Sequence, residues 1–146
     1  MATVDLNPQT EKYFHKPHFS QPAAAGGNSV RNWGADRLDV ILANAHRHEL
    51  TVCVGLWLGH PRYGFDYQHE TTITRQLGQC LEVVRKYKSH PAMLLWGIGN
   101  EMEGDGRNPA IWYAIDHIAR EIRQLDPHHP TMTEFADRSL QHCSCR

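Results

Sequence analysis

An amide and a carboxylate stand side by side at the end of an apolar run, and their types suit them to chemistry. Asn100 and Glu101 follow residues 93–99, MLLWGIG, which have the composition of a buried strand. A carboxyl group at such a strand end can be desolvated, which raises its pKa toward the value that a general acid needs near neutral pH. The neighbouring amide can donate to and accept from a hydroxyl-rich substrate. The pair indicates acid/base chemistry, although a strand that simply ends in solvent would look the same.

The composition is that of a globular protein with one hydrophobic core. Of 146 residues, 40% are hydrophobic and 21% are charged, and this length suits a single domain. The 15 Lys and Arg nearly balance the 16 Asp and Glu, so we expect neither nucleic acid nor a membrane as a partner. No apolar run is long enough to span a bilayer, and no signal peptide is visible, so a cytoplasmic location is the default expectation.

The four cysteines do not follow the spacing of a paired CxxC metal site. Cys53 and Cys80 lie in apolar patterns that are typical of core thiols. His142, Cys143 and Cys145 could bind a soft metal, or they could belong to a frayed tail. Apart from that alternative, we expect no metal and no cofactor.

Strand and helix patterns alternate along most of the chain. Residues 1–25 carry several prolines and no period, so they are predicted to be an irregular leader, with a domain over 26–136 and an irregular tail over 137–146. Each predicted helix has apolar residues at the i, i+3, i+4, i+7 spacing, and Asp36 and Asn108 are predicted N-caps. The predicted strands are 28–33, 51–58, 93–99 and 131–136, and the predicted helices are about 36–50, 71–87 and 109–125.

This alternation predicts an α/β fold with a parallel sheet and right-handed crossovers. The loops 59–70 and 100–108 follow strands and are long, and in such folds the strand-to-helix loops build the active site. Both an open doubly wound sheet and part of an eight-stranded barrel fit the pattern. Met102 stands where a dinucleotide fingerprint needs its third glycine, and no Walker-type loop is present. We therefore favour the barrel.

Three segments resemble the catalytic barrel of clan A glycoside hydrolases, especially family 2-like members related to β-galactosidases and β-glucuronidases. They are residues 27–34 (GNSVRNWG), 51–60 (TVCVGLWLGH) and 95–101 (LWGIGNE). The resemblance covers about residues 26–136 and includes the connecting helices. It implies a partial (β/α)8 TIM barrel, consisting of about strands two to five with their helices.

The resemblance also implies roles for five residues near strand ends. Glu101 matches the general acid/base, and Asn100 matches the residue that binds the sugar 2-hydroxyl group. Arg31 matches the arginine that supports the nucleophile carboxylate, or it forms a salt bridge within the barrel. Trp57 and His60 could line the sugar subsite through an aromatic face and a hydrogen bond, although Trp57 equally suits barrel filling.

The family's nucleophile has no counterpart in this pattern. In the family it is a second Glu at the end of the seventh strand, and double displacement needs two carboxyl groups about 5–5.5 Å apart. Here the predicted strands stop at the fifth, and Glu134 matches no nucleophile motif. A complete barrel needs roughly 250 residues, so a truncated or partial gene product would explain both ends. Glu103 and Asp105 suit a solvated acidic loop better than a cation site.

The resemblance thus implies a retaining glycoside hydrolase of carbohydrate metabolism, acting on β-glycosides, as a truncated barrel with the acid/base but without the nucleophile. An alternative is a catalytically inactive carbohydrate-binding or assembly module. A third possibility is a redox or metal protein that uses His142, Cys143 and Cys145. Because a barrel fragment leaves strand edges and apolar surface exposed, we also expect self-association.

Overall fold

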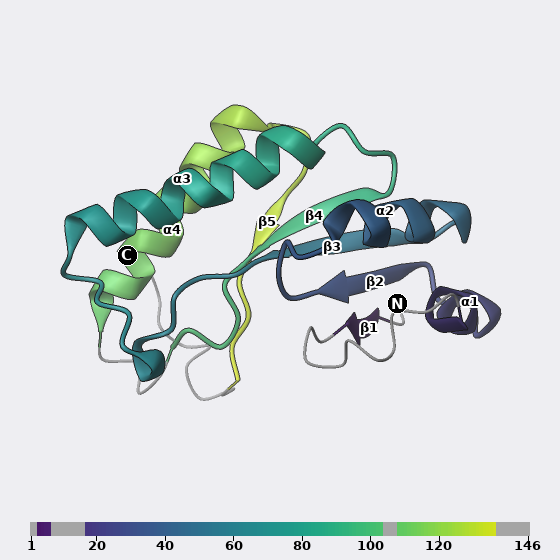
Figure 1. The fold of residues 1–146 in the computed structure, drawn as a ribbon, viewed down its shortest axis with the longest axis horizontal. Coiled ribbons are helices and arrows are strands. Elements are labelled where there is room, and N and C mark those ends of the chain that lie inside the picture. Colours follow the sequence, from purple (N-terminus) through teal and green to yellow (C-terminus); the bar gives the residue numbers. More distant parts are fainter. Residues whose placement is uncertain (1–2, 7–16, 104–107, 137–146) are drawn as a thin grey trace.

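A five-stranded parallel sheet forms the centre of the molecule in a computed structural model, which describes residues 3–6, 17–103 and 108–136. Helices connect successive strands along the chain (Figure 1). The strands are β1 (Thr3–Leu6), β2 (Ser29–Asn32), β3 (Thr51–Leu56), β4 (Met93–Ile98) and β5 (Thr131–Met132). The helices are α1 (Pro17–Ala24), α2 (Leu38–Arg47), α3 (Glu70–Tyr87) and α4 (Pro109–Leu125).

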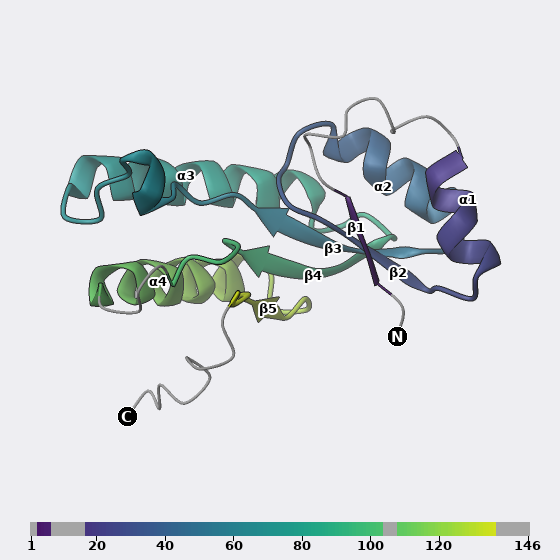
Figure 2. The ribbon, with the colours of Figure 1, turned by 90° about the horizontal axis from the view of Figure 1, so that it is seen from below.

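The strand order confirms the predicted βα repeat. Neighbouring strands follow the order β1-β2-β3-β4-β5, and all four pairs are parallel. A doubly wound sheet reverses its strand order at a switch point, whereas a barrel adds each new strand on the same side of the last. Helices α3 and α4 lie side by side against the sheet (Figure 2). The architecture is therefore a partial TIM barrel.

Two regular elements lie among the described residues of the segment 1–25, which was predicted to be an irregular leader. β1 pairs in parallel with β2, with Val4 opposite Val30, and α1 follows before β2 begins. A four-residue strand is too short to show a period in the sequence. Helix α1 contains Pro22 in its interior, a residue that normally breaks helices. With β1 in first place, β2 to β5 occupy the second to fifth positions of the sheet.

The helix and strand ends show where the sequence patterns succeed and fail. The Asn108 side chain accepts a hydrogen bond from the Ala110 N–H, which confirms the predicted N-cap of α4. The prediction that Asp36 is the N-cap of α2 was wrong. The N-cap is Arg37, whose side chain makes no capping hydrogen bond. Glu49 has a φ of 57°, so the helix predicted to reach residue 50 ends earlier. The last strand is also shorter than predicted, since β5 ends at residue 132.

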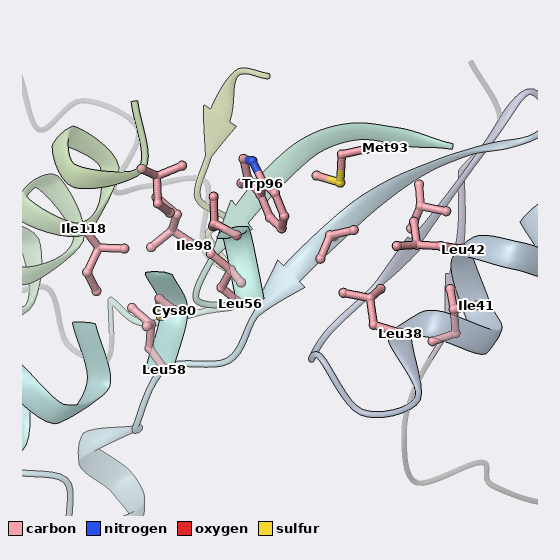
Figure 3. Close-up of a cluster of buried hydrophobic side chains, with 14 of the residues drawn as sticks. Leu38, Ile41, Leu42, Leu56, Leu58, Cys80, Met93, Trp96, Ile98 and Ile118 are labelled. Atoms are coloured by element: carbon pink, nitrogen blue, oxygen red, sulfur yellow. The ribbon is translucent and has the colours of Figure 1, made fainter. Parts of the chain in front are cut away.

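The hydrophobic core lies between the sheet and its helices (Figure 3). On this face β3 contributes Val54 and Leu56, and their partners in register on β4 are Trp96 and Ile98. All four are at most 2% exposed, which explains the nearly continuous apolar sequence of β3. The helices supply Leu38, Ile41 and Leu42 from α2, Cys80 and Val84 from α3, and Ile118 and Ile122 from α4.

The opposite face of the sheet carries Arg31 and Cys53 as partners in register, and Leu95 lies beside Cys53. This face would point into a closed barrel. Arg31 and Cys53 are buried, but Leu95 is half-buried. Because five strands do not close a barrel, this face is only partly covered.

No helix in the described part of the chain is long and apolar enough to cross a membrane.

Candidate active site

The chain turns sharply where β4 ends. Gly99 has a φ of 68° and Glu101 a φ of 51°, both in the left-handed region. At Gly99 the turn requires glycine, because a Cβ atom there would lie 2.6 Å from Cγ of Met102. This turn places Asn100 and Glu101 at the carboxyl end of β4, the end where the loops of parallel α/β folds build active sites.

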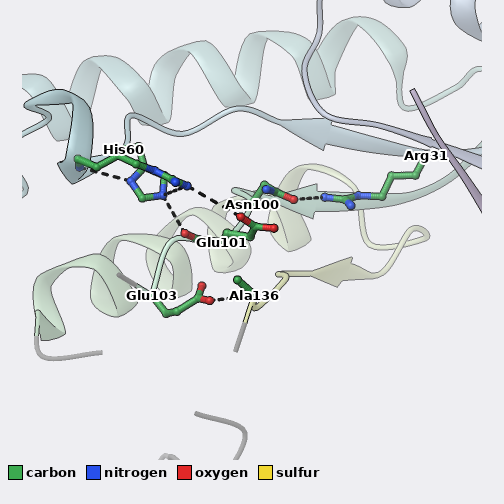
Figure 4. A network of polar contacts seen from close by, with 7 residues as sticks. Arg31, His60, Asn100, Glu101, Glu103 and Ala136 are labelled. Carbon is green, nitrogen blue, oxygen red and sulfur yellow. Dashed lines mark hydrogen bonds and ion pairs between the residues drawn. The ribbon is translucent and has the colours of Figure 1, made fainter. Parts of the chain in front are cut away.

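Arg31 reaches across β3 to the end of β4. Its Nη2 donates a hydrogen bond of 2.7 Å to Oδ1 of Asn100, and its Nη1 forms an ion pair with the Glu134 carboxylate. Figure 4 shows the guanidinium of Arg31 pointing at Asn100. Because a guanidinium only donates, the amide oxygen of Asn100 must face it. The amide N–H groups of Asn100 are then available for another acceptor.

The Glu101 carboxyl group is open to solvent. Its side chain is 46% exposed, and its Oε2 lies 3.9 Å from Nη2 of Arg62. It lines a hollow of about 200 Å³ with His60, Arg62, Glu103 and Ala136. From the sequence we expected a desolvated carboxyl group, but a carboxyl group that is nearly half exposed keeps much of its hydration. Among the described residues, Glu101 therefore lacks the burial that was expected of it.

His60 lies beside Glu101 but faces its backbone. The residue is 6% exposed, and its Nε2 lies 2.8 Å from the Glu101 carbonyl oxygen. Its Nδ1 accepts a hydrogen bond of 3.4 Å from the Arg62 N–H. The structure thus brings the two predicted site residues together, as Figure 4 shows, with both ring nitrogens of His60 engaged by protein groups.

Trp57 does not share the hollow that Glu101 lines. The residue is 52% exposed in this open sheet. It borders a second hollow of about 440 Å³ between the end of β3, the loop before α2 and one side of α3. The other residues that line this hollow are Gly34, Ala35, Asp36, Leu56, Gln79, Cys80 and Val83.

Three charged residues of the site were missed or misread in the sequence. Arg62 approaches Glu101, and the His60-Pro61 pair that begins its 3-10 helix (Pro61–Tyr63) is the sequence signal that could have placed it. Glu134 was placed inside a strand, whereas it follows β5 and pairs with Arg31. Glu103 was expected in a solvated loop but is 4% exposed, and its Oε1 accepts from the Ala136 N–H.

No group of three His, Cys, Asp or Glu side chains suited to a metal ion occurs among residues 3–6, 17–103 and 108–136. The predicted alternative of a soft metal at His142, Cys143 and Cys145 lies outside the described residues, and so does Asp105. What the described site offers is one exposed carboxyl group, an amide donor held by Arg31, and a cation beside the carboxylate.

A parallel sheet in sequential βα order, with polar side chains gathered at the carboxyl ends of its strands, is the arrangement of a TIM-barrel domain. The sequence model of the family "Glycosyl hydrolases family 2, TIM barrel domain" matches residues 43–144. This match covers more than half of the chain, and the chain belongs to that family.

Individual relatives agree with this membership. The chain is 25% identical over 108 residues to a β-glucuronidase of Pongo abelii, and the match covers 72% of this chain but 16% of the relative. A crystal structure of a Parabacteroides merdae β-glucuronidase superposes with a TM-score of 0.60 at 16% identity, over 90% of this chain and 17% of that one. A GH5_18 protein of Bifidobacterium longum subsp. infantis gives a TM-score of 0.65 at 13% identity, over 92% of this chain and 43% of that one. The two structures show the shared fold, and the chain spans about one sixth of the curated relative.

Proposed function

We propose that this chain carries the acid/base half of a retaining glycoside hydrolase site that acts on β-linked glycosides. The observation that supports this most directly is the arrangement at the end of β4, where Asn100 is hydrogen-bonded to Arg31 and Glu101 opens into a hollow. In this proposal a carboxylate nucleophile, for which the described residues offer no candidate, attacks the anomeric carbon while Glu101 protonates the glycosidic oxygen of the leaving aglycone, and Glu101 later deprotonates the water that hydrolyses the glycosyl-enzyme. One relative is a β-glucuronidase, which makes β-glucuronides the first substrates to test.

Asn100 is proposed to donate to the sugar 2-hydroxyl group. The bond from Arg31 to Oδ1 fixes the orientation of the amide, so that the N–H groups are directed away from the guanidinium. A donor in fixed orientation costs little reorganisation when charge develops on the sugar ring. Arg31 would therefore support the substrate contact through Asn100.

Hydrolysis of aryl β-glycosides tests the acid/base role. In Glu101→Gln the turnover of a 4-nitrophenyl glycoside should fall about 10²–10⁴-fold, the usual contribution of a general acid or base. With a dinitrophenyl glycoside, the rate of the first step, in which the aryl group leaves, should fall less in Glu101→Gln, because this leaving group needs less protonation. Azide, which attacks without a general base, should restore part of the lost turnover. Measurable hydrolysis that Glu101→Gln leaves unchanged would remove Glu101 from the mechanism.

A second candidate function is a catalytically inactive carbohydrate-binding or assembly module. The observation that favours it is the ion pair between Arg31 and Glu134, since it engages the arginine that the family uses to support a nucleophile. This alternative predicts sugar binding or association without turnover. Isothermal titration that shows binding of a glycoside which the chain does not hydrolyse would distinguish it from the enzyme.

Trp57 is proposed to offer an aromatic face to a sugar in the second hollow, which Glu101 does not line. Its half-exposed indole and the polar Asp36 and Gln79 beside it suit the apolar and hydroxyl faces of a pyranose. Oligosaccharide binding should then weaken in Trp57→Ala but persist in Tyr113→Ala, which removes an exposed aromatic residue of α4. Equal affinities in the two variants would exclude this role.

A further inference from the structure

We infer that His60 is a positioning residue for Glu101, and that its Nε2–H holds the left-handed turn from which the Glu101 carboxyl group projects. The inference rests on the proposed acid/base role of Glu101 for its functional meaning. Its structural content, a hydrogen bond that fixes one backbone conformation, stands independently of turnover.

The backbone of Glu101 needs such support. Its φ of 51° lies in the left-handed region, which residues other than glycine, asparagine and aspartate seldom adopt. Conformations of this kind persist where surrounding contacts determine them. Glu101 is followed by the buried Met102, so the chain has little freedom to relax without disturbing the core.

Two hydrogen bonds hold the Glu101 backbone from opposite directions. The His60 ring lies 2.8 Å from its carbonyl oxygen, and its own N–H donates to the Glu134 carbonyl oxygen at 3.1 Å. The first contact comes from the loop after β3 and the second from the segment after β5. Glu101 is thus fixed between the two strands that neighbour β4.

The contacts of His60 determine which ring nitrogen carries the proton. Nδ1 receives the Arg62 backbone N–H at 3.4 Å, so it acts as an acceptor. In a neutral ring the proton then lies on Nε2, which can donate to the Glu101 carbonyl oxygen. Nη2 of Arg62 also lies 3.0 Å from Nε2, but two donors do not bond to each other. That contact instead leaves the guanidinium near the Glu101 carboxylate, as the 3.9 Å separation shows.

Burial separates this role from direct sugar binding. His60 is 6% exposed, and its ring meets that of Tyr63 edge to face at a centroid distance of 5.9 Å. Both ring nitrogens are engaged by the backbone of the protein. A sugar hydroxyl group could bind His60 only by displacing a contact that supports Glu101.

Paired substitutions of His60 test the inference. The amide nitrogen of glutamine extends about as far as Nε2 of histidine, whereas the shorter asparagine side chain reaches only the place of Nδ1. His60→Gln should therefore keep the bond to the Glu101 carbonyl group, and His60→Asn should lose it. His117→Asn, on the exposed surface of α4, is the control for replacing a histidine.

Nuclear magnetic resonance gives the first readout, and it needs no substrate. The HN–Hα coupling and the Cα shift of Glu101 should report positive φ in the wild type, His60→Gln and His117→Asn, and should change in His60→Asn. The ¹⁵N shifts of the wild-type ring should show a protonated Nε2 and an unprotonated Nδ1. The opposite tautomer would overturn the inference even if His60→Asn failed to fold.

Kinetics gives the second readout. In His60→Asn we expect kcat for the aryl glycoside to fall about 10²-fold, as misplacement of a reacting group does, while KM stays near the wild-type value and His60→Gln recovers part of kcat. A rise in KM with an unchanged Glu101 turn would make His60 a sugar ligand and overturn the inference. If the wild type hydrolyses nothing, the proposed function fails, and the resonance data alone decide whether His60 positions Glu101.

Discussion

The guanidinium of Arg31 donates to the side-chain oxygen of Asn100 at 2.7 Å, across 69 residues of sequence. Arg31 lies on β2 and Asn100 follows β4, and β3 lies between these strands. The side chain therefore spans a neighbouring strand at the carboxyl end of the sheet. With Glu134 as its second partner, Arg31 joins the ends of β2, β4 and β5.

Replacement of Arg31 should destabilise the fold. Its side chain is 9% exposed and that of Glu134 is 25% exposed, so Arg31→Met leaves a largely buried carboxylate and an amide oxygen without their donor. We expect a loss of about 2 kcal/mol in the free energy of unfolding, measured by urea denaturation. Arg31→Lys should recover only part of the lost stability, because one ammonium group does not reproduce the contacts of the guanidinium with both Asn100 and Glu134.

The matched control for Arg31 is a surface ion pair. Arg120 pairs with Asp116 one turn earlier on α4, at side-chain exposures of 67% and 61%. Arg120→Met should change the free energy of unfolding by at most about 0.5 kcal/mol, the usual value of an exposed helical pair. Equal effects of Arg31→Met and Arg120→Met would show that the Arg31 contacts do not stabilise the fold.

Two glycines that face each other in the sheet should differ in their response to alanine. A Cβ atom on Gly55 would clash with the Asn32 carbonyl oxygen and lie 2.7 Å from backbone atoms of Trp33. Backbone cannot move aside cheaply, so Gly55→Ala should cost about 2 kcal/mol or more. On the partner residue Gly97, the new atom would meet Cys53 Sγ at an ordinary 3.7 Å, and Gly97→Ala should cost clearly less. Denaturation midpoints in the reverse order would contradict this packing.

Asp126 should make stability depend on acid pH. Burial raises the pKa of its carboxyl group, but hydrogen bonds from Trp96 Nε1 and His129 outweigh burial and hold the pKa below the ordinary value. A carboxyl group with a depressed folded-state pKa stabilises the fold above its unfolded-state pKa of about 4, and this stabilisation is lost as pH falls through the folded value.

Urea denaturation between pH 7 and pH 3 measures this dependence. Asp126→Asn should be less stable than the wild type at pH 7, and the difference should shrink as the pH falls below about 4. Asp116→Asn, at an exposed position of α4, should leave the pH profile of the wild type nearly unchanged. A constant difference between Asp126→Asn and the wild type over this range would exclude the linkage.

The periodic part of the fold could be predicted from the sequence because its signals are local. The apolar residues of α4 recur along one buried face, and the Asn108 cap needs only its own helix. The strand β1 could not be predicted, because four residues carry no distinct period. It is defined by its partner, as when Val4 pairs with Val30.

The residues of the site likewise include some that the sequence could place and others that it could not. Asn100, Glu101 and Arg31 could be placed at strand ends, since parallel strands bring their carboxyl ends to one edge. The contacts of Arg62 and Glu134 depend on loops that meet only in the folded chain, so no spacing in the sequence reveals them. The orientation of His60 toward a backbone carbonyl group is likewise a property of the tertiary structure.

The last strand of the sheet presents a surface that we expect to bind a second copy of the chain. β5 has two residues, and the apolar edge surface, defined as Met132 and Phe135, is 37% and 41% exposed. Phe135 packs on Trp112 of α4 at a ring-centroid distance of 5.4 Å, whereas Met132 contacts Cys53 on the opposite face of the sheet, so apolar side chains lie on both sides of this edge. Exposed strand edges flanked by apolar side chains favour association.

Sedimentation velocity at a series of protein concentrations measures this association. The wild type should shift toward larger species as its concentration rises, and Phe135→Lys and Met132→Lys should reduce the shift, because a buried lysine at the contact would lose its hydration. Tyr63→Lys is the control, since Tyr63 is 75% exposed but lies in the 3-10 helix after β3. Association that Tyr63→Lys weakens as much as Phe135→Lys would place the contact elsewhere. A wild type that stays monomeric at every concentration and unfolds cooperatively would contradict the prediction, since the exposed edge would then carry no affinity for a second copy.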